Sequence, residues 1–583
     1  MSSVSHITHE AVQKIGGIGA VLHGLITSPA YQKEIGRTLL VGPLFSPSEE
    51  DEIARDGEVL FSSFSGIQDE AIAEKLLPIQ QMYQVGFVYG RRRIRDSANG
   101  NEAQPEVLLV DVREVNPARE NQFKFELYER FGLQSDRYEH AYDFLQYLRL
   151  AEPAYDAISA LLGKEPGPHF ILSHEYMGMP TALKTILVAD PRFRTIFHAH
   201  EVATMRPIVE GSLGHDTMFY NVMAEACEQD LGVSEVFGDQ SDSYRHALIE
   251  RSRHCDNIFA VGDYTLKELK FLGPAFRDVP IELVYNGIPA FEVSLEEKWA
   301  SVERLRQYAE ALCGTRPEVI FTHVTRLVIS KGLWRDLQVL EHLDEVFEKD
   351  GRKGVFYVLS TAGGTRSSED VLRMEAEYGW PAVHQEGYPD LVGGEVDFWR
   401  IADAFNKKAR AIRVIFVNQF GWDRESCGIR MPEEMGMMDL RKGSYLEFGQ
   451  SIYEPFGIAQ VEPLSFGALC VVSNVCGCCG YVKRAAHGTD SPNLVVGDYT
   501  TLPRKRSLDE LKKIDMLERE WVEAVTTKVV AQEILERLPG TRKEMEASLQ
   551  RGFELAKNMS WDRVCQDLFL PGLKRAEKRK KLG

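Results

Sequence analysis

The chain has 583 residues and a formal net charge of −19, with 44% hydrophobic and 27% charged residues. This composition is ordinary for a globular enzyme, and the length is too great for one core, so two large domains are expected. The acidic balance argues against a nucleic-acid partner, because no broad basic field exists to neutralise phosphates. No apolar run approaches the length of a membrane span and the N-terminus lacks a signal pattern, so we expect a cytoplasmic protein with no membrane partner.

A glycine-rich segment at residues 14–19 precedes the first helical stretch. Glycine lets backbone N–H groups approach a ligand closely, and a helix start favours an anion. Lys14, Gly16 and Gly17 are therefore candidate ligand-binding residues, although many loops need glycine for the turn alone.

Short apolar runs then alternate with helical stretches through the first half of the chain. Continuous apolar runs are typical of parallel strands that are buried on both faces. The predicted strands are residues 38–42, 107–110, 170–172, 195–197 and 258–261. A turn sequence at 286–289 indicates that the first domain is ending, and we place this domain at residues 1–295.

Two histidines, His198 and His200, close one of these strands, and Arg206 lies six residues beyond the second. Alternate residues of a strand share a face, so this pair could bind zinc, although a buried, hydrogen-bonded histidine is also common. His174 closes the preceding strand, and we expect it to line the same ligand-binding cleft as His198 and His200.

The alternation restarts in the second half of the chain, which favours parallel sheets covered by helices. The predicted strands here are residues 319–324, 355–359 and 414–417. We place the second domain at residues 315–555, the last part of which is mostly helical and highly charged.

Two cations, Arg326 and Lys331, follow the first strand of this second domain. An arginine and a lysine five residues apart at the end of a strand can converge on one diphosphate. Two fixed cations would stabilise the charge on a departing diphosphate without a metal ion. The alternative interpretation is an ordinary surface ion pair.

The most informative stretch is residues 451–463, in which Glu454 and Glu462 are eight positions apart and Gly457 marks a turn into a helix. Eight residues are slightly more than two helical turns, so Glu462 is expected on nearly the same face as the helix start. The free N–H groups and positive end of the helix favour a phosphate. A carboxylate at each end could hold one sugar on either side of a diphosphate, which a nucleotide-sugar glycosyltransferase needs.

The cysteines favour free thiols, because their number is odd and the chain lacks a signal pattern. Cys476, Cys478 and Cys479 cluster after a strand-like run. A metal site would need a second pair of ligands nearby, so we interpret them as small loop residues.

These segments together resemble the retaining glycosyltransferases of the GT-B fold and, within them, the glycogen synthase family in its animal and fungal branch. Glu454 and Glu462 match the Glu-x7-Glu signature, residues 14–17 are similar to the Lys-x-Gly-Gly loop, and His200 with Arg206 is similar to the His-Ala-Thr-x-x-x-Arg segment. Further similar segments are residues 87–91, 249–256 and 285–288.

Two departures bear on substrate choice. The Arg-x-x-x-x-Lys-Gly form of residues 326–332 is more similar to bacterial and plant synthases, and Ile458 stands where the animal and fungal branch has an aromatic residue at the nucleobase. The nucleobase of the donor therefore stays open.

The resemblance implies an α/β chain of GT-B fold, with two Rossmann-like domains and a cleft between them. Residues 1–295 would form the acceptor-side domain and residues 315–555 the nucleotide-sugar domain. A C-terminal helix, residues 556–583, would cross back to the first domain.

The resemblance also implies retaining transfer of glucose from UDP-glucose or ADP-glucose to the non-reducing end of an α-1,4-glucan, without a metal or other cofactor. The implied catalytic residues are His200 facing the donor sugar, Glu454 holding its hydroxyls, and Arg326 and Lys331 on its diphosphate, while Glu462 would hold the ribose. The other implied donor-binding residues are Lys14, Gly16, Gly17, Arg206, Phe456, Gly457 and Ile458.

Three alternatives stay open at this point. The first is a retaining transferase with a small sugar or sugar phosphate as acceptor. The second is an epimerase or phosphorylase on the same fold, and the third is a non-catalytic binding scaffold. The oligomeric state is also open, with a homo-oligomer as one option.

Overall fold

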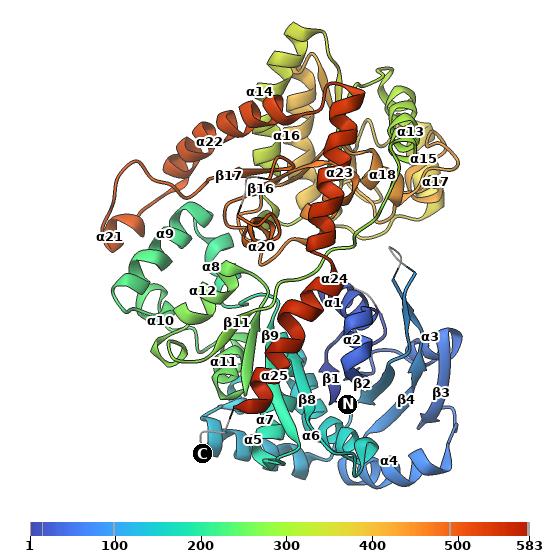
Figure 1. Cartoon of the computed structure of the whole chain (residues 1–583), viewed down its shortest axis with the longest axis vertical. Helices are drawn as coiled ribbons and strands as arrows, with labels where there is room; N and C mark the ends of the chain where they lie inside the picture. Colours follow the sequence, from blue (N-terminus) through green and yellow to red (C-terminus); the bar gives the residue numbers. More distant parts are fainter. Residues whose placement is uncertain (1, 14–15, 97–99, 489–490, 580–583) are drawn as a thin grey trace. The chain divides into compact units, whose positions relative to one another are not determined.

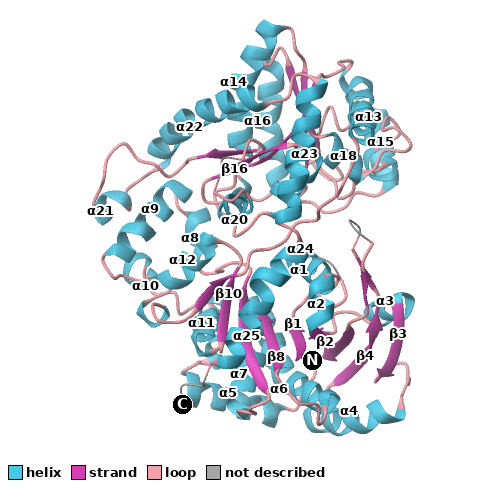
Figure 2. Cartoon of the chain, in the orientation of Figure 1, coloured by secondary structure: helices cyan, strands magenta, loops and turns pink. Residues whose placement is uncertain are grey.

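The computed structural model describes residues 2–13, 16–96, 100–488 and 491–579. The chain forms two compact units (Figure 1). Unit 1 comprises residues 1–205, 226–287 and 561–583, and unit 2 comprises residues 206–225 and 288–560. In both units, helices flank a sheet (Figure 2).

The sheet of unit 1 contains all five strands that were predicted in the first half, which confirms them. Its strands are β1 (Ser2–Ile7), β2 (Ile35–Pro43), β3 (Gly57–Ser62), β4 (Gly86–Arg92), β7 (Glu106–Asp111), β8 (His169–His174), β9 (Phe193–Ala199), β10 (Asn257–Ala260) and β11 (Ile281–Leu283). Their order is β11-β10-β9-β8-β1-β2-β7-β4-β3. β4 pairs antiparallel with β7 and with β3, and the other pairings are parallel.

The helices of unit 1 connect these strands. They are α1 (Gly17–Ile26), α2 (Pro29–Glu34), α3 (Ser48–Asp56), α4 (Glu70–Tyr83), α5 (Pro117–Phe131), α6 (Tyr142–Leu162), α7 (Glu175–Val188), α10 (Val233–Phe237), α11 (Tyr244–Glu250) and α12 (Asp263–Phe271). Two further helices, α8 (Met205–Gly211) and α9 (His215–Glu228), run across the boundary with unit 2. A short antiparallel pair, β5 (Ile94–Arg95) and β6 (Glu102–Ala103), stands outside the main sheet.

The C-terminal segment belongs to unit 1, as the predicted fold class requires. Its helices are α24 (Trp561–Val564) and α25 (Leu570–Lys578), and α25 contacts β9 and β10 (Figure 1). A Cβ on Gly24 would collide with the Trp561 indole, so glycine lets α1 approach that ring. Asp562 accepts hydrogen bonds from the Ser28 hydroxyl and the Ala30 N–H, both at 2.9 Å.

Unit 2 is built on a fully parallel sheet with the order β14-β13-β12-β15-β16-β17. These strands are β12 (Val319–Val324), β13 (Gly354–Leu359), β14 (Ile412–Val417), β15 (Leu446–Gly449), β16 (Leu469–Ser473) and β17 (Leu494–Gly497). The three strands predicted in this half are confirmed as β12, β13 and β14.

Three helices of unit 2 begin at residues whose side chains cap them. Ser294, Ser367 and Asp515 each accept a hydrogen bond from a first-turn N–H, which satisfies a donor that the helix itself leaves free. The helices are α13 (Leu295–Cys313), α14 (Leu333–Asp350), α15 (Ser368–Tyr378), α16 (Gly394–Lys408), α17 (Arg424–Cys427), α18 (Met437–Gly443), α19 (Ile458–Val461), α20 (Cys478–Ala485), α21 (Leu508–Leu511), α22 (Met516–Arg537) and α23 (Arg542–Asn558).

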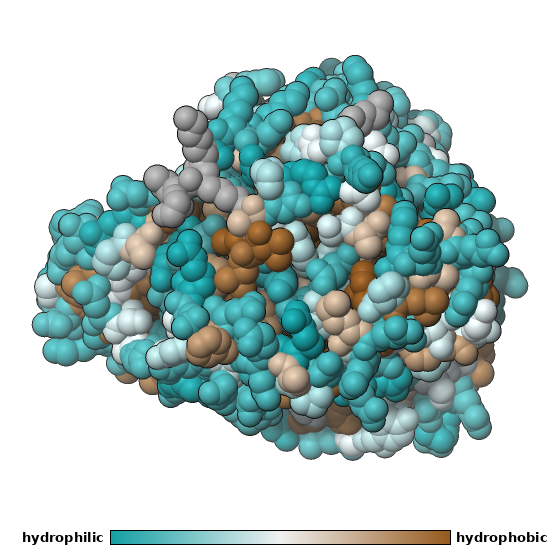
Figure 3. All heavy atoms as spheres, turned by 90° about the horizontal axis from the view of Figure 1, so that it is seen from below, coloured by the Kyte–Doolittle hydropathy of each residue, from teal (hydrophilic) through white to brown (hydrophobic). Residues whose placement is uncertain are grey.

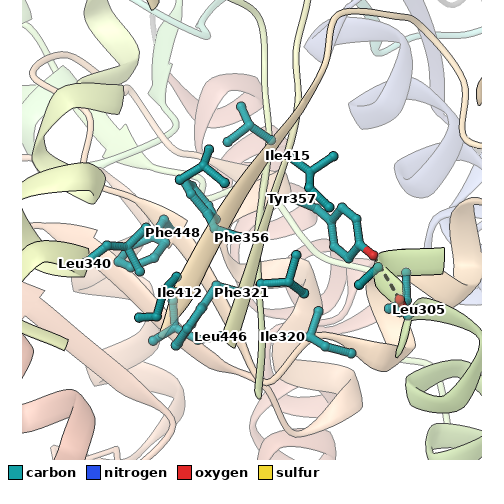
Figure 4. Packing of buried hydrophobic residues seen from close by; sticks show 14 of the residues in the cluster. Leu305, Ile320, Phe321, Leu340, Phe356, Tyr357, Ile412, Ile415, Leu446 and Phe448 are labelled. Atoms are coloured by element: carbon teal, nitrogen blue, oxygen red, sulfur yellow. Dashed lines mark hydrogen bonds between the residues drawn. The ribbon is translucent and has the colours of Figure 1, made fainter. Parts of the chain in front are cut away.

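The core of unit 2 lies between this sheet and its helices. Figure 4 shows Phe321, Phe356 and Phe448 from neighbouring strands packing together, and Tyr357 pointing toward α13. The Tyr357 hydroxyl donates a 2.8 Å hydrogen bond to the Leu305 carbonyl, so this buried polar group is satisfied. The packed sheet is the rigid base from which the loops of the candidate site project.

The surface is largely polar on the face shown in Figure 3, where hydrophilic residues predominate and hydrophobic ones form separate patches. Among the described residues, no helix has both the length and the apolar character needed to cross a bilayer.

Candidate active site

The loop after β12 carries Lys331 to the start of the Glu454 segment. Gly332 has a φ of +62°, and a Cβ there would collide with the Gln450 carbonyl, so this position needs glycine on both counts. The Ile452 N–H donates to the Ser330 carbonyl at 2.8 Å. These contacts fix the two loops against each other within unit 2.

Lys331 and Glu454 form an ion pair, with each side chain only 13% exposed. The Glu454 carbonyl accepts from the Gly477 N–H at 3.0 Å, and the Phe456 carbonyl accepts from the Cys478 N–H at 2.9 Å. The glutamate segment is therefore held by its own backbone as well as by Lys331. The structure thus brings together a cation and a carboxylate that the sequence assigned to adjacent parts of one ligand.

Arg206 joins this pair, because the segment 206–225 packs with unit 2. Its Nη1 donates to the Ser330 hydroxyl at 3.3 Å, and its guanidinium lies 4.9 Å from the centre of the Tyr453 ring. Arg206 follows His200 by six residues in the chain, but two of its contacts are with the loops of unit 2 that carry Lys331 and Glu454.

Arg326 stands apart from this cluster. The residue is exposed, and its guanidinium has no hydrogen-bond or ion-pair partner among the described residues. The five-residue spacing therefore does not bring Arg326 and Lys331 onto a shared protein partner.

The helix after Gly457 is shorter than predicted. Gly457 has a φ of +91°, and α19 spans one turn before Glu462 begins a 3₁₀ turn that contains Pro463. Proline lacks an N–H and cannot continue an α-helical ladder, which is the physical reason for the change. Glu462 therefore does not lie on a continuous α-helix, which was the basis for expecting it on nearly the same face as the helix start.

Glu462 instead pairs with a residue that the sequence did not indicate. Its Oε2 lies 3.3 Å from Nη2 of Arg441 on α18, and the Glu462 side chain is 22% exposed. Arg441 also contacts Glu447 at 3.1 Å. Arg441 lies in no recognised motif, so no local signal could have revealed it.

A buried polar network lies behind the glutamate segment. Arg335 is fully buried and pairs with Asp216 at 2.7 Å and with Glu523 at 2.9 Å. Its guanidinium lies 3.8 Å from the centre of the Tyr499 ring, whose hydroxyl donates to Gln450 at 2.6 Å. The network fixes residues 206–225 and the start of the glutamate segment within one unit.

The nine cysteines are free, as expected. Cys476, Cys478 and Cys479 are buried, and the Cys476 thiol lies 3.3 Å from the Ser473 hydroxyl. Burial raises the pKa of Cys476, so its thiol stays protonated at neutral pH.

The glycine-rich loop of unit 1 binds an anion that the chain itself supplies. The Gly16 and Gly19 N–H groups donate to Oε2 of Glu10 at 2.7 and 2.9 Å. The start of α1 therefore favours negative charge, as predicted, but a carboxylate of the same unit occupies it. A Cβ on Gly17 would meet open space, and Lys14 lies outside the described residues.

His200 ends a hydrogen-bonded chain in unit 1. His200 Nε2 lies 2.8 Å from His174 Nδ1, and His174 Nε2 lies 2.9 Å from His6 Nδ1. The chain continues from His6 Nε2 to the Tyr31 hydroxyl at 3.1 Å and then to Thr38 at 3.0 Å. Burial lowers the pKa of His6 to about 3 and the pKa of His200 well below its usual value, so both rings are neutral at pH 7.

No protein-family model matches the sequence, and no curated protein matches it. Solved structures do match over nearly the whole chain. One is the E. coli trehalose-6-phosphate protein bound with UDP-2-fluoro glucose, with 12% identity, a TM-score of 0.51, and coverage of 99% of this chain and 100% of that one. Another is the catalytic domain of starch synthase IV from Arabidopsis thaliana bound to ADP and acarbose, with 14% identity, a TM-score of 0.51 and coverage of 99% of both chains.

A third is trehalose-6-phosphate synthase OtsA, with 13% identity, a TM-score of 0.50, and coverage of 98% of this chain and 99% of that one. At this level of identity the likeness concerns the fold. The chain has the α/β fold of GT-B glycosyltransferases, which confirms the predicted fold class.

Proposed function

We propose that the chain is a retaining glycosyltransferase that transfers glucose from UDP-glucose or ADP-glucose to the non-reducing end of an α-1,4-glucan. The main support for the proposal is the Lys331–Glu454 ion pair. It places a lysine that would bind the diphosphate of the donor next to a carboxylate that would bind its sugar. Arg206 adds a second positive charge, a guanidinium beside Ser330. The fold shared with a starch synthase bound to ADP supports it.

The chemistry follows from where charge develops. When the bond between the glucosyl carbon and the diphosphate oxygen breaks, negative charge grows on the leaving phosphate. Lys331 and the exposed Arg326 would meet that charge, while Glu454 would hold the sugar hydroxyls. The donor would also contact the residues that follow Glu454, which are Phe456, Gly457 and Ile458. Glu462 would bind the ribose of the donor. In unit 1, His200 would face the donor sugar, and Gly16 and Gly17 would border it.

A sugar phosphate is the second candidate acceptor. Among the matched structures, OtsA is named as a trehalose-6-phosphate synthase. An acceptor of this class would be a small anion rather than a glucan chain. The two proposals share the donor site and differ in the acceptor.

One assay separates these proposals. UDP-glucose and ADP-glucose are supplied side by side, with glycogen or glucose 6-phosphate as acceptor, and labelled glucose is followed into polymer or small product. Incorporation into glycogen supports the first proposal, and a phosphorylated disaccharide supports the second. Release of phosphorylated glucose only when inorganic phosphate is present would instead indicate a phosphorylase. Unchanged donor under every condition would favour the binding scaffold.

We expect the transfer to need no metal ion, because Lys331 and Arg326 can supply the positive charge that a metal would otherwise provide. Activity should survive an excess of chelator in the assay above. Loss of activity on chelation, with recovery on addition of manganese or magnesium, would show that this expectation is wrong.

Replacing Glu462 by glutamine should weaken donor binding. The change keeps the shape and one acceptor oxygen but removes the charge of a group proposed to accept from the ribose. A charge-assisted hydrogen bond of ~1.5–3 kcal/mol becomes a neutral one of ~0.5–1.5 kcal/mol, so Kd should rise roughly fivefold to tenfold. Calorimetric titration with each donor measures it. Glu434→Gln, an exposed glutamate that also pairs with an arginine, is the matched control and should bind normally. Unchanged affinity in Glu462→Gln would remove Glu462 from the donor site.

A further inference from the structure

Three histidines of unit 1 lie together where two paired strands end. His174 is the last residue of β8, His198 lies opposite it in the register with β9, and His200 follows β9 directly. One ligand nitrogen from each ring lies within 4.8 Å of the other two. The strands are hydrogen-bonded neighbours near the middle of the sheet, so the positions of these side chains are set by a rigid element.

The His198 ring differs from the other two in its hydrogen bonding. Its side chain is buried, with 2% exposure, and neither Nδ1 nor Nε2 has a hydrogen-bond partner among the described residues. Buried polar atoms are rarely left without a partner, because they lose their hydrogen bonds to water and gain nothing in return. The ring centres of His198 and His200 are only 4.2 Å apart, so the unpartnered ring lies within the cluster.

The chain of hydrogen bonds from His200 to Thr38 can present lone pairs to a common ligand. If each proton points toward Thr38, His174 donates from Nε2 to His6 and His6 donates from Nε2 to Tyr31. The Nδ1 of His174 then carries a lone pair. The Nε2 of His200 also carries one if the proton of the His200 ring is on its Nδ1. A histidine that donates its other ring N–H to a neighbour is the usual arrangement of a metal ligand, since that bond fixes the tautomer and the ring orientation.

We propose that His174, His198 and His200 bind a divalent transition-metal ion of the zinc class. Imidazole suits zinc and its neighbours, whereas magnesium and calcium prefer oxygen ligands. Zinc–nitrogen bonds of about 2.0–2.1 Å set tetrahedral ligand nitrogens about 3.3 Å apart. His174 Nδ1 and His200 Nε2 lie 2.8 Å apart and would separate slightly by side-chain rotation, and one nitrogen of each ring already lies within 4.8 Å of the other two. Three protein ligands leave a fourth position for water or another ligand.

Binding should be measured on the full-length protein after chelator treatment and desalting. Calorimetric titration with zinc chloride should show one tight site, and cobalt chloride should give the intense visible absorption of a tetrahedral complex. His198→Phe removes one ligand without leaving a polar group unpaired, and it should lower zinc affinity ~100-fold or more, since changes to metal surroundings alone cost 10–100-fold. His169→Phe, at the opposite end of β8, is the matched control and should bind zinc as the wild type does.

Equal zinc affinity in His198→Phe and wild type would overturn the proposal, as would the absence of tight binding in wild type. If His198→Phe fails to fold in a thermal melt, X-ray absorption of the zinc-loaded wild type decides. A first shell with three imidazole nitrogens supports the site. A shell of thiolates or mainly of oxygen would place the ion elsewhere and overturn it.

One consequence rests on the proposed function, because His200 is there assigned to the donor sugar. A bound ion would occupy His200, so zinc should inhibit transfer and chelator should restore it, in keeping with a reaction that needs no metal. Tight binding without inhibition would leave the metal site standing and count against the role of His200 only.

Discussion

Replacing Lys331 by alanine should lower the kcat of glucosyl transfer by ~100-fold or more, as expected for a lost electrostatic stabiliser. Lys331 is the partly buried cation in contact with Glu454, and it is proposed to meet charge that grows as the donor bond breaks. An interaction that is stronger in the transition state raises kcat, whereas uniform binding lowers only KM. The measurement is kcat and KM for the donor at saturating acceptor.

Two variants make this result interpretable. Lys407→Ala removes a lysine that also pairs with a carboxylate but is 74% exposed, and it should leave kcat unchanged. Lys331→Arg keeps the charge near Glu454 and should recover part of the activity. A thermal melt checks that Lys331→Ala folds. If Lys331→Ala raised KM and left kcat unchanged, the proposal that Lys331 stabilises the leaving group would be wrong.

Replacing Arg335 by methionine should destabilise unit 2 by about 3–5 kcal/mol, the usual cost of removing one partner from a buried ion pair. Arg335 is fully buried, and its loss leaves the Asp216 and Glu523 carboxylates without their shared cation. Burial already raises the pKa of Asp216, so the stranded carboxylate would protonate more readily still. Urea denaturation of the variant and the wild type measures the difference.

The matched control is Arg400→Met. Arg400 pairs with Glu386 at 2.9 Å, but both side chains are more than 60% exposed, and exposed pairs contribute about 0–1 kcal/mol. Equal stability losses in Arg335→Met and Arg400→Met would show that the buried network does not stabilise unit 2.

The strands predicted from the sequence were those with continuous apolar runs, and β1, one of the strands that were not predicted, shows why. β1 reads Ser-Ser-Val-Ser-His-Ile and lies in the middle of the unit 1 sheet, mostly buried. Its polar groups are satisfied by partners far along the chain: Ser3 bonds to His169 at 2.6 Å and His6 to His174. A local pattern carries no record of such partners, so no strand was predicted where the fold has a central one.

The candidate site divides in the same way. Lys331 and Glu454 lie in recognisable segments, and the structure brings them into contact. Arg441, the partner of Glu462, comes from a different helix and has no motif of its own. The free N–H groups of the glycine-rich loop were predicted to receive an anion, but the sequence could not show that Glu10 would reach them.

The most direct test of the account is proton NMR of a reaction that contains donor, acceptor and the full-length protein. The account predicts that the α-glucosyl signal of UDP-glucose or ADP-glucose is replaced by a new α-glycosidic signal as the nucleoside diphosphate is released in equal amount. A β-linked product, or an unchanged donor with glycogen and with glucose 6-phosphate, would contradict it.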